Sequence, residues 1–358
     1  MATLRVGVIF GGRSGEHEVS VVSAASVFAH LRRDRYAPVP IRVEKDGRWV
    51  LAAREPVAAS PTDAAATRSA DDRPVDPVGA IVGERLDVVF PVLHGPYGED
   101  GTVQGLLELL DMAYVGAGVL GSAAGMDKAV SKTLFAAAGL PIVGHVTVLR
   151  QDWERDPARV TARVSDSLRY PVFVKPANLG SSVGISKTLS PDGLAAGVGE
   201  ALQFDDKIVV ESGVPNAREI ECAVLGNDDP VASLPGEIIV THADGFYSYD
   251  AKYLDSTGAT PEIPAAIGPE TSDEIRRLSI EAFRVLDLAG MARVDFFLGE
   301  RGDIYLNEVN TIPGFTAISM YPKMWQATGL PYPDLLDRLV TLALERHARR
   351  RRLRTSRL

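Results

Sequence analysis

Two stretches in the C-terminal third of the sequence decide the fold: MARVDFF at residues 291–297 and NEVNTIPGFT at residues 307–316. Each reads as a short strand, and GERGD at residues 299–303 between them reads as a turn, so the sequence predicts a β-hairpin. Because side chains alternate between the two faces of a strand, residues two positions apart project from the same face. The hairpin can therefore collect polar side chains of both strands on one side.

Four polar residues follow this alternation. Arg293 and Asp295 share one face of the first strand, and Glu308 and Asn310 share one face of the second. If the two faces coincide, two carboxylates meet across the hairpin, where like charges destabilise each other unless a cation binds. Two carboxylates and an amide oxygen are ligands for a hard divalent ion, and Mg²⁺ accompanies substrate phosphates. The structural alternative is an exposed hairpin with scattered charges.

The composition is that of a soluble globular protein with no nucleic-acid partner. The chain has 358 residues, 46% hydrophobic and 24% charged, and this length predicts two or three domains. A net charge of −9 leaves no broad basic surface for nucleic acid. We expect the one basic run, Arg346 to Arg357, to be a frayed, solvated tail.

The sequence also indicates a cytoplasmic protein without a membrane partner. No apolar run is long enough to span a bilayer, and the N-terminus enters a strand directly without an export signal. The single cysteine, Cys222, excludes a disulfide within the chain and fits a reducing compartment.

The first segment of the chain predicts a doubly wound parallel sheet. A buried strand at residues 4–10, a helix at 16–31 and a strand at 37–43 form a β-α-β unit, and another buried strand follows at 87–93. Residues 52–82 show no sustained period, so we expect a variable insertion with little functional content.

The character of the sequence changes near Gly121. A helix beginning at Met126 opens a second segment, with strands predicted at residues 143–149, 172–175 and 207–211. The predicted domains are residues 1–122, with the insertion at about 52–82; residues 123–212; residues 213–346; and a basic tail at residues 347–358.

Two lysines and a glycine-rich loop predict phosphate binding. KPANLGSSVG at residues 175–184 places Lys175 at a strand end before a loop whose backbone N–H groups can surround phosphate oxygens. Lys128, on the helix of the second segment, is the second candidate. A flexible hairpin loop and a solvated lysine are the alternatives, and the loop is not a Walker A motif.

Two glutamates can complete a nucleotide site. Glu211 ends a strand, where it can read an adenine amino group, and Glu219 can take the ribose hydroxyls. Ordinary surface glutamates are the alternative. GAGVLG at residues 116–121 matches the dinucleotide pattern G-x-G-x-x-G, but no acidic residue follows at the required distance, so we interpret it as a decoy.

Residues at the ends of the first predicted strands indicate a further ligand site. Glu16 begins a helix after a glycine-rich turn. Its carboxylate there can bind an ammonium group, or it can simply be stabilised by the helix dipole. His94 follows another strand and faces the crevice in which α/β sheets bind ligands, although a lone histidine is more often structural. The polar and aromatic stretch at residues 242–253 is typical of a lid.

Taken together, these motifs strongly resemble the D-alanine–D-alanine ligases of the ATP-grasp superfamily, in the family's order from residue 11 to about 320. The resemblance implies an α/β fold, α+β in its C-terminal part, of three domains, the first with a doubly wound parallel sheet. The motifs that carry it are GG at 11–12, EHEVS at 16–20, HG at 94–95, MDK at 126–128, KPANLGSSVG at 175–184, KY at 252–253, RVD at 293–295 and EVNTIPG at 308–314.

The resemblance also implies a role for each matching residue. The residues that would bind ATP are Lys128, Lys175, Ser182, Glu211, Val214, Glu219, Lys252 and Asn307. Among them, the backbone of Val214 would contact the base, and Lys252 would lie near the γ-phosphate. Two Mg²⁺ or Mn²⁺ ions would be held by Asp295, Glu308 and Asn310. The amino-acid substrates would be bound by Glu16, His94, Arg293, Gly314, Ser319 and Met320.

Two groups would act directly in the reaction. Glu16, Ser181 and Tyr253 resemble a hydrogen-bonded trio that ties the first domain to two closing loops. Arg293 and the backbone N–H of Gly314 resemble the donors to an oxyanion.

The implied reaction joins two D-alanines through a D-alanyl phosphate, releasing ADP and phosphate, for peptidoglycan precursor synthesis. A homodimer is expected from the same resemblance. Ligases that join D-alanine to D-lactate carry a histidine where this chain has Tyr253, which favours an amine nucleophile; D-serine remains an alternative second substrate. A non-catalytic nucleotide-binding module would be expected to have lost its metal and oxyanion residues, and all of these are present.

Overall fold

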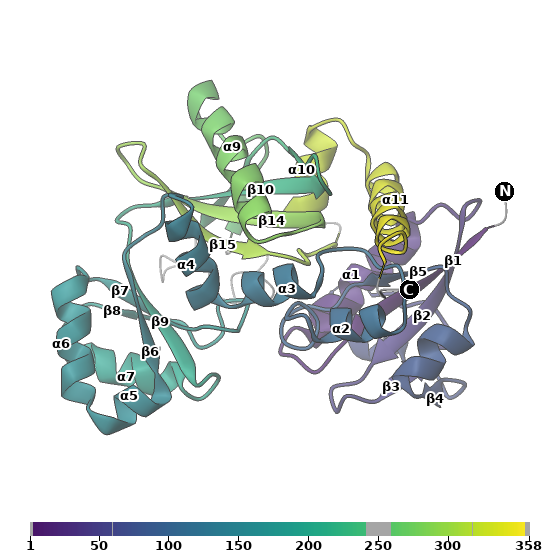
Figure 1. Ribbon diagram of the computed structural model, residues 1–358, viewed down its shortest axis with the longest axis horizontal. Helices are drawn as coiled ribbons and strands as arrows, with labels where there is room; N and C mark the ends of the chain where they lie inside the picture. The colour runs from purple at the N-terminus through teal and green to yellow at the C-terminus, as the bar shows by residue number, and fades with distance from the viewer. Residues whose placement is uncertain (1–2, 59, 241–258, 317, 355–358) are drawn as a thin grey trace.

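The computed structural model describes residues 3–58, 60–240, 259–316 and 318–354 (Figure 1). Within these ranges the chain forms three β-sheets with helices packed on them, which confirms the α/β class. Lys252, Tyr253 and the predicted lid lie outside the described residues.

The N-terminal sheet has the strand order β4-β3-β2-β1-β5. Its central strands β1, β2 and β5 are parallel, as predicted, while β3 and β4 add an antiparallel edge. Separate apolar clusters cover the two faces of the sheet, one against α1 and one against α2. The elements are β1 (Leu4–Gly11), α1 (His17–His30), β2 (Tyr36–Val43), β3 (Trp49–Leu51), β4 (Arg73–Val75), β5 (Val88–Pro91) and α2 (Thr102–Leu109).

Residues 52–82, predicted as a variable insertion with little functional content, contain regular secondary structure. This segment forms a 3-10 helix (Pro61–Thr67) packed on α1, strand β4 at the edge of the sheet, and a short π-helix (Gly79–Gly83) packed against β3. Arg42 of β2 is buried and pairs with Asp72 of the segment at 2.6 Å. Without the structure, no sequence period reveals these contacts, because each of the elements is only a few residues long.

The second segment contains a four-stranded antiparallel sheet of order β6-β9-β7-β8. Its elements are α3 (Val119–Met126), α4 (Lys128–Ala137), β6 (His145–Leu149), α5 (Arg150–Arg155), α6 (Pro157–Ser167), β7 (Val172–Pro176), β8 (Ser186–Thr188), α7 (Pro191–Ala201) and β9 (Lys207–Ser212). Helices α5, α6 and α7 cover one face of this sheet.

The helix predicted to begin at Met126 begins at Lys128 instead. Met126 ends the preceding helix α3, and Asp127 caps α4 by accepting hydrogen bonds from the backbone N–H groups of Ala129 and Val130, both at 3.0 Å. Gly121 is explained by packing: a Cβ there would lie 2.8 Å from the carbonyl oxygen of Asp287. This glycine therefore serves helix packing, which agrees with its interpretation as a decoy.

The third sheet has the order β13-β12-β10-β14-β15, with β11 paired to β10. Helix α9 covers its outer face, where the apolar residues of β10, β14 and β15 are buried. The elements are β10 (Arg218–Gly226), β11 (Val231–Ala232), β12 (Gly236–Val240), β13 (Ala259–Glu262), α9 (Pro269–Val285), β14 (Gly290–Leu298), β15 (Ile304–Asn310), α10 (Met320–Ala327) and α11 (Tyr332–Arg350).

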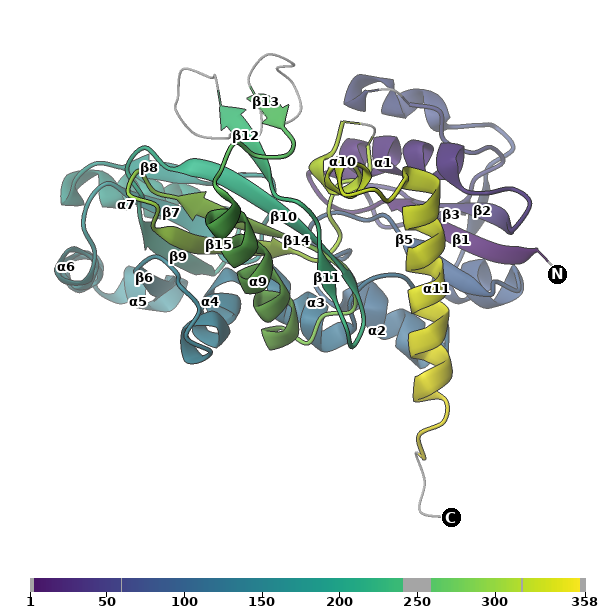
Figure 2. The same cartoon turned by 90° about the horizontal axis from the view of Figure 1, so that it is seen from above.

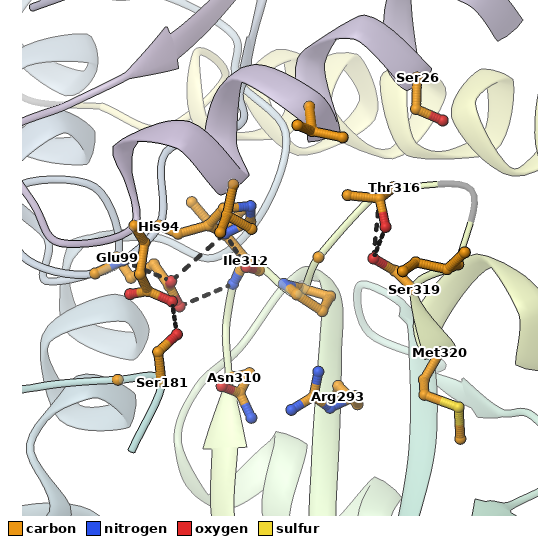
Figure 3. A pocket seen from close by; sticks show the side chains of 18 of the residues that line it. Ser26, His94, Glu99, Ser181, Arg293, Asn310, Ile312, Thr316, Ser319 and Met320 are labelled. Atoms are coloured by element: carbon orange, nitrogen blue, oxygen red, sulfur yellow. Dashed lines mark hydrogen bonds and ion pairs between the residues drawn. The ribbon is translucent and has the colours of Figure 1, made fainter. Parts of the chain in front are cut away.

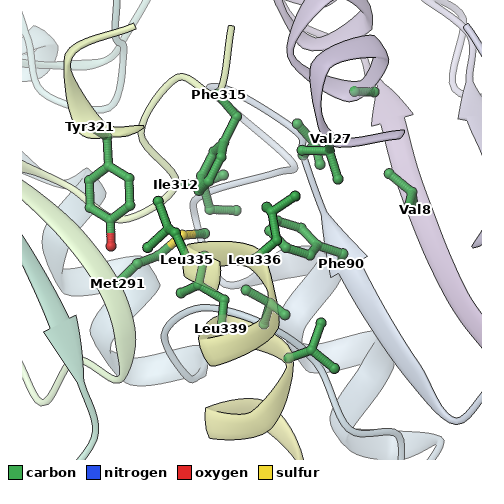
Figure 4. Packing of buried hydrophobic residues seen from close by; sticks show 14 of the residues in the cluster. Val8, Val27, Phe90, Met291, Ile312, Phe315, Tyr321, Leu335, Leu336 and Leu339 are labelled. Carbon is green, nitrogen blue, oxygen red and sulfur yellow. The ribbon is translucent and has the colours of Figure 1, made fainter. Parts of the chain in front are cut away.

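Helix α11 joins the first and third sheets through one shared core. It packs against β5 and α1 on one side and against β10 and β14 on the other (Figure 2). Leu335, Leu336 and Leu339 of this helix lie between Phe90 of β5 and Met291 of β14 (Figure 4). The N-terminal and C-terminal parts of the chain, predicted as separate domains, are therefore held together by common apolar packing.

The basic run after Arg346 is not a frayed tail as far as residue 351. The guanidinium of Arg346 lies 4.5 Å from the ring centroid of Tyr114 and donates hydrogen bonds to the backbone carbonyls of Tyr114 and Gly116. Arg350 pairs with Glu108, and Arg351 pairs with Asp111 at 3.3 Å. The end of α11 is thus anchored on the first segment.

We expect Arg346→Ala to destabilise the protein by about 1–3 kcal/mol, because two carbonyls and an aromatic face lose a half-buried partner. Arg349→Ala is the matched control on the same helix, since Arg349 pairs with Asp228 while both side chains are more than half exposed. Its loss should cost about 1 kcal/mol or less. Denaturant unfolding of the two variants measures the difference, and equal midpoints would contradict the anchoring role.

Candidate active site

The pairing of β14 with β15 brings the predicted metal residues together. Asp295 lies directly opposite Glu308, and Arg293 lies directly opposite Asn310, so all four side chains share one face of the sheet. Strand β10 adds Glu221 opposite Asp295 on the same face. The predicted hairpin and its shared polar face are confirmed.

A β-bulge interrupts the hairpin beside this cluster. The pairing passes from Asp295 with Glu308 to Phe296 with Leu306, which leaves Asn307 as the extra residue. Its backbone carbonyl accepts a hydrogen bond from Lys132 at 3.0 Å, and its side-chain oxygen accepts one from Lys175 at 3.3 Å. The bulge therefore places Asn307 in contact with Lys132 and Lys175 of the second segment.

Each carboxylate of the hairpin is paired with a cation. Arg293 donates two hydrogen bonds of 2.7 Å to Asp295 and lies 3.0 Å from Glu221. Burial would lower the pKa of Arg293, but Asp295 and Glu221 outweigh it, so that its pKa is raised. Lys128 lies 3.2 Å from Glu308. Asp295 and Glu308 can therefore lie opposite each other, because a cation compensates the charge of each carboxylate.

The donor set on this face fits a divalent ion that completes its coordination with phosphates. Asp295, Glu308 and Asn310 supply oxygen ligands of the type Mg²⁺ prefers. Within the described ranges no three His, Cys, Asp or Glu side chains are grouped to hold a metal. An ion here would therefore rely on the amide of Asn310 and on substrate oxygens as well as on the two carboxylates.

A second polar face lies on the sheet of the second segment. Alternation places Lys175 and Glu211 on the same side, away from the apolar cluster that includes Val174 and Val210. Glu211 is 2% exposed and lies between two ammonium groups, Lys175 at 2.7 Å and Lys132 at 3.0 Å. Burial would raise the pKa of Glu211, but the two lysines lower it to about 2.

The two polar faces meet. Lys175 lies 6.0 Å from the ring centroid of Phe297, which projects from β14 on the same side as Asp295. Glu219, opposite Phe297 on β10, belongs to this face as well. Val214 follows β9, close to the turn of the hairpin at Gly299. The residues predicted to bind the nucleotide are thus divided between two facing sheets.

The glycine-rich loop reaches across to the first segment. Ser181 and Ser182 have positive φ angles of 52° and 58°, and Ser181 Oγ donates a hydrogen bond to Glu16 Oε1. A Cβ on Gly180 would lie 3.2 Å from the Glu16 carboxylate, so glycine permits this approach. Lys128 donates a hydrogen bond of 2.8 Å to the carbonyl of Leu179 in the same loop.

Both ring nitrogens of His94 are engaged by the protein. Nδ1 donates to the carbonyl of Ile312 at 3.0 Å, and Nε2 lies 3.2 Å from Ser23 Oγ. Ser23 Oγ also accepts a hydrogen bond from the backbone N–H of Phe315 at 3.3 Å. His94 therefore positions the loop on either side of Gly314, and this geometry counts against a direct hydrogen bond from its ring to a substrate.

One cavity of about 890 Å³ is lined by all the predicted substrate residues and by Lys128, whereas Lys175 and Ser182 do not line it (Figure 3). Met320 begins helix α10, and Ser319 precedes it with Oγ 3.0 Å from the backbone N–H of Thr316. The predicted residues that line the cavity are Glu16, His94, Lys128, Ser181, Arg293, Glu308, Asn310, Gly314, Ser319 and Met320.

Three residues of this region were not singled out from the sequence. Glu221 is two positions after Glu219 and so faces the same way, a signal that strand alternation provides. Lys132 is four positions after Lys128 on α4 and so shares its helix face. Glu99, whose side chain accepts the backbone N–H of Gly95 at 2.9 Å, follows a turn and had no such signal.

Facing sheets that bring lysines and a glycine-rich loop against a carboxylate hairpin define an ATP-grasp enzyme. Family models match here: "D-ala D-ala ligase N-terminus" over residues 5–117 and "D-ala D-ala ligase C-terminus" over residues 134–341. The chain belongs to the D-alanine–D-alanine ligase family and is an ATP-dependent ligase.

Curated and solved relatives agree with this membership. D-alanine–D-alanine ligase A of Bradyrhizobium diazoefficiens is 47% identical over 98% of this chain and 97% of its own length, and that of Escherichia coli is 46% identical over 99% and 100%. The structure of the Coxiella burnetii D-alanine–D-alanine ligase matches with a TM-score of 0.81 and 37% identity, covering 98% of this chain and 97% of its own.

One of the solved structures that match is named for another second substrate. The VanG D-Ala:D-Ser ligase of Enterococcus faecalis matches with a TM-score of 0.82 and 34% identity, over 96% of this chain and 100% of its own. Because the curated relatives at 46–47% identity are named D-alanine–D-alanine ligases, the alternative of a D-alanine–D-serine ligase is not favoured. No helix in the described ranges is long and apolar enough to cross a membrane.

The pairing of His94 with Glu99 predicts a pH-dependent stability. Burial would lower the pKa of His94, but the negative charges of Glu99, whose Oε1 lies 3.8 Å from Nδ1, and of Glu16 outweigh burial and raise it. Because the pKa of His94 is higher in the folded than in the unfolded protein, its protonation stabilises the fold. This contribution is complete below the unfolded-state pKa of about 6.5 and is lost as the pH rises through the folded-state pKa.

We therefore expect Glu99→Gln to lower the melting temperature most below about pH 6.5, with the deficit shrinking at higher pH. Glutamine keeps an oxygen that can accept the same backbone N–H but removes the charge. Melting curves of both proteins across pH measure this difference, and a deficit that does not change with pH would disprove the charge effect.

Proposed function

We propose that this chain joins two D-alanines to D-alanyl-D-alanine in the cavity between the first and third sheets, with ATP held between the second and third. The observation that carries the proposal is the meeting of Glu16, Ser181, Arg293 and Gly314 around one cavity, beside lysines and a carboxylate hairpin. An amino-acid ammonium, a reacting carboxylate and a phosphate chain each find a complementary group there.

The chemistry explains why such a site needs ATP. A carboxylate is a poor electrophile and its oxygen is a poor leaving group, so two zwitterions do not form an amide spontaneously. Transfer of the γ-phosphoryl group to the first D-alanine gives an acyl phosphate and ADP. Attack by the second amine then builds a tetrahedral oxyanion, which collapses with release of phosphate.

Four residues hold the reacting groups in this proposal. Glu16 binds the ammonium of the first D-alanine, and Ser181 fixes Glu16 by its hydrogen bond. Arg293 and the backbone N–H of Gly314 donate to the oxyanion as charge develops on it. In addition, Ser319 and Met320 line the second amino-acid site, and Tyr253 joins Glu16 and Ser181 in the trio that closes the site.

The nucleotide occupies the two facing sheets. Lys128, Lys175 and Lys252 contact phosphates, with Ser182 and Asn307 beside them. Glu211 and the backbone of Val214 read the base, and Glu219 takes the ribose. Two Mg²⁺ or Mn²⁺ ions, bound by Asp295, Glu308 and Asn310, neutralise charge on the phosphates.

The state and location of the protein are also proposed from the family. We propose a homodimer in the cytoplasm, without nucleic-acid or membrane partners. Light scattering coupled to size-exclusion chromatography tests the dimer directly, and a monomeric mass at micromolar concentration would reject it.

Phosphate release from ATP and Mg²⁺ tests the function. We expect release to depend on D-alanine alone, to stop when the divalent ion is chelated, and to yield the dipeptide by mass spectrometry. Parallel reactions with D-serine or D-lactate test the second site. A preferred mixed product would overturn the substrate assignment, and release independent of D-alanine would overturn the reaction.

Replacing Arg293 tests the oxyanion role. We expect Arg293→Met to lower kcat by about 10²- to 10³-fold with ATP binding retained, because one donor to the oxyanion is lost. Arg293→Lys keeps the charge beside Asp295 and Glu221 but loses the paired donors. Its kcat should therefore lie between that of the unmodified protein and that of Arg293→Met. A steady-state assay with a separate nucleotide-binding measurement distinguishes these outcomes, and wild-type kcat in either variant removes the role.

A further inference from the structure

The proposed roles leave one buried lysine of the nucleotide site unexplained. Lys132 is 1% exposed and lies on α4 one turn after Lys128, on the same helix face. A lysine is almost never fully buried unless it is paired. The contacts of its ammonium group therefore identify what it does.

Lys132 connects the base-reading carboxylate to the bulged hairpin. Its Nζ lies 3.0 Å from Glu211 Oε1 and donates a hydrogen bond of 3.0 Å to the carbonyl of Asn307. The approach to Glu211 lacks hydrogen-bond geometry, and Oε1 accepts no hydrogen bond from the part of the chain that the structure describes. This buried oxygen pairs with a charge yet keeps a lone pair for another N–H donor.

Glu211 shares its two lysines unequally. Lys175 lies 2.7 Å from Oε2 and also bonds the side chain of Asn307, and it is the lysine proposed to contact phosphate. Together the three side chains carry one net positive charge, which suits a polyanion. When the ammonium of Lys175 turns to a phosphate, Glu211 would be buried without a cation if Lys132 were absent.

The fixed carbonyl distinguishes the two lysines. The backbone carbonyl of Asn307 belongs to a strand of the third sheet, so its hydrogen bond holds Lys132 in place. Among the described residues, the contacts of the Lys175 ammonium are with side chains, namely Glu211, the amide of Asn307 and the ring of Phe297. Lys132 therefore stays with Glu211, whereas Lys175 can exchange partners.

We propose that Lys132 is the positioning residue for base recognition: it keeps Glu211 ionised and oriented so that Oε1 accepts the 6-amino group of adenine while Lys175 engages phosphate. This inference rests on the proposed placement of ATP between the two sheets. It makes Lys132 a determinant of the preference for adenine over a 6-oxopurine, whose oxygen cannot donate to Glu211.

The test compares ATP with inosine triphosphate, which carries an oxygen in place of the 6-amino group. We expect Lys132→Met to reduce the ratio of kcat/KM for ATP to that for inosine triphosphate by about tenfold or more. The loss should fall on KM for ATP, with kcat at saturating ATP and KM for D-alanine nearly unchanged. Lys132→Arg, which keeps the charge, should recover part of the preference.

Three further variants serve as controls. Lys45→Met is the control, because Lys45 pairs with Glu18 at 2.6 Å on the surface, away from the nucleotide cleft, and should leave the ratio unchanged. If Lys132→Met alone folds poorly, the double variant Lys132→Met/Glu211→Gln removes both charges of the pair. It should show the same ratio as Glu211→Gln alone, because Lys132 acts through Glu211.

Each contrary result has a distinct meaning. An unchanged ratio in Lys132→Met, with D-alanine-dependent phosphate release intact, would overturn the inference. An equal fall in kcat with both nucleotides would also overturn it, because Lys132 would then act through Asn307 on the chemistry. Failure of the proposed function looks different: the unmodified protein would release no D-alanine-dependent phosphate with either nucleotide.

Discussion

The register of β14 against β15 is the constraint on which the rest of the site depends. Because side chains alternate along a strand, a slip of β15 by one residue would turn Glu308 and Asn310 away from Asp295 and Arg293 and expose the apolar face that packs on α9. The apolar face therefore fixes the polar one. The bulge at Asn307 adds the single irregularity that turns this regular pairing toward the lysines of the neighbouring sheet.

Charge in the cleft is balanced within the protein itself. Asp295 has Arg293, Glu308 has Lys128, and Glu211 has two lysines, so each of these three carboxylates has a counter-ion. A bound nucleotide and its metal ions would exchange these pairs rather than add bare charges to a low-dielectric site. The affinity for nucleotide then depends on the difference in free energy between the ion pairs of the free protein and those of the complex. A single substitution in the cleft changes both.

The sequence predicted what depends on neighbours along the chain. Alternation placed Asp295 opposite Glu308, and the motif order led to the family. Contacts between distant segments left no such trace. Arg346, which holds Tyr114, was assigned to a frayed tail, and Asp72, which pairs with Arg42, was assigned to a variable insertion. The helix start predicted at Met126 is wrong, because Asp127 caps a new helix there and Met126 ends the preceding one. Lys132 was visible as a helix position but not as a buried group.

Helix α11 has a mechanical consequence. By packing between the first and third sheets it makes them one body, whereas the sheet of residues 145–212 has an apolar cluster of its own. Besides ion pairs and hydrogen bonds, a three-residue cluster of Ala129, Ala177 and Val209 links that sheet to α4. The glycine-rich loop extends from this sheet, and the hydrogen bond of Ser181 to Glu16 links it to the first segment across the cavity. Any displacement of the second sheet relative to the other two would therefore break a bond to the residue proposed to hold the substrate ammonium.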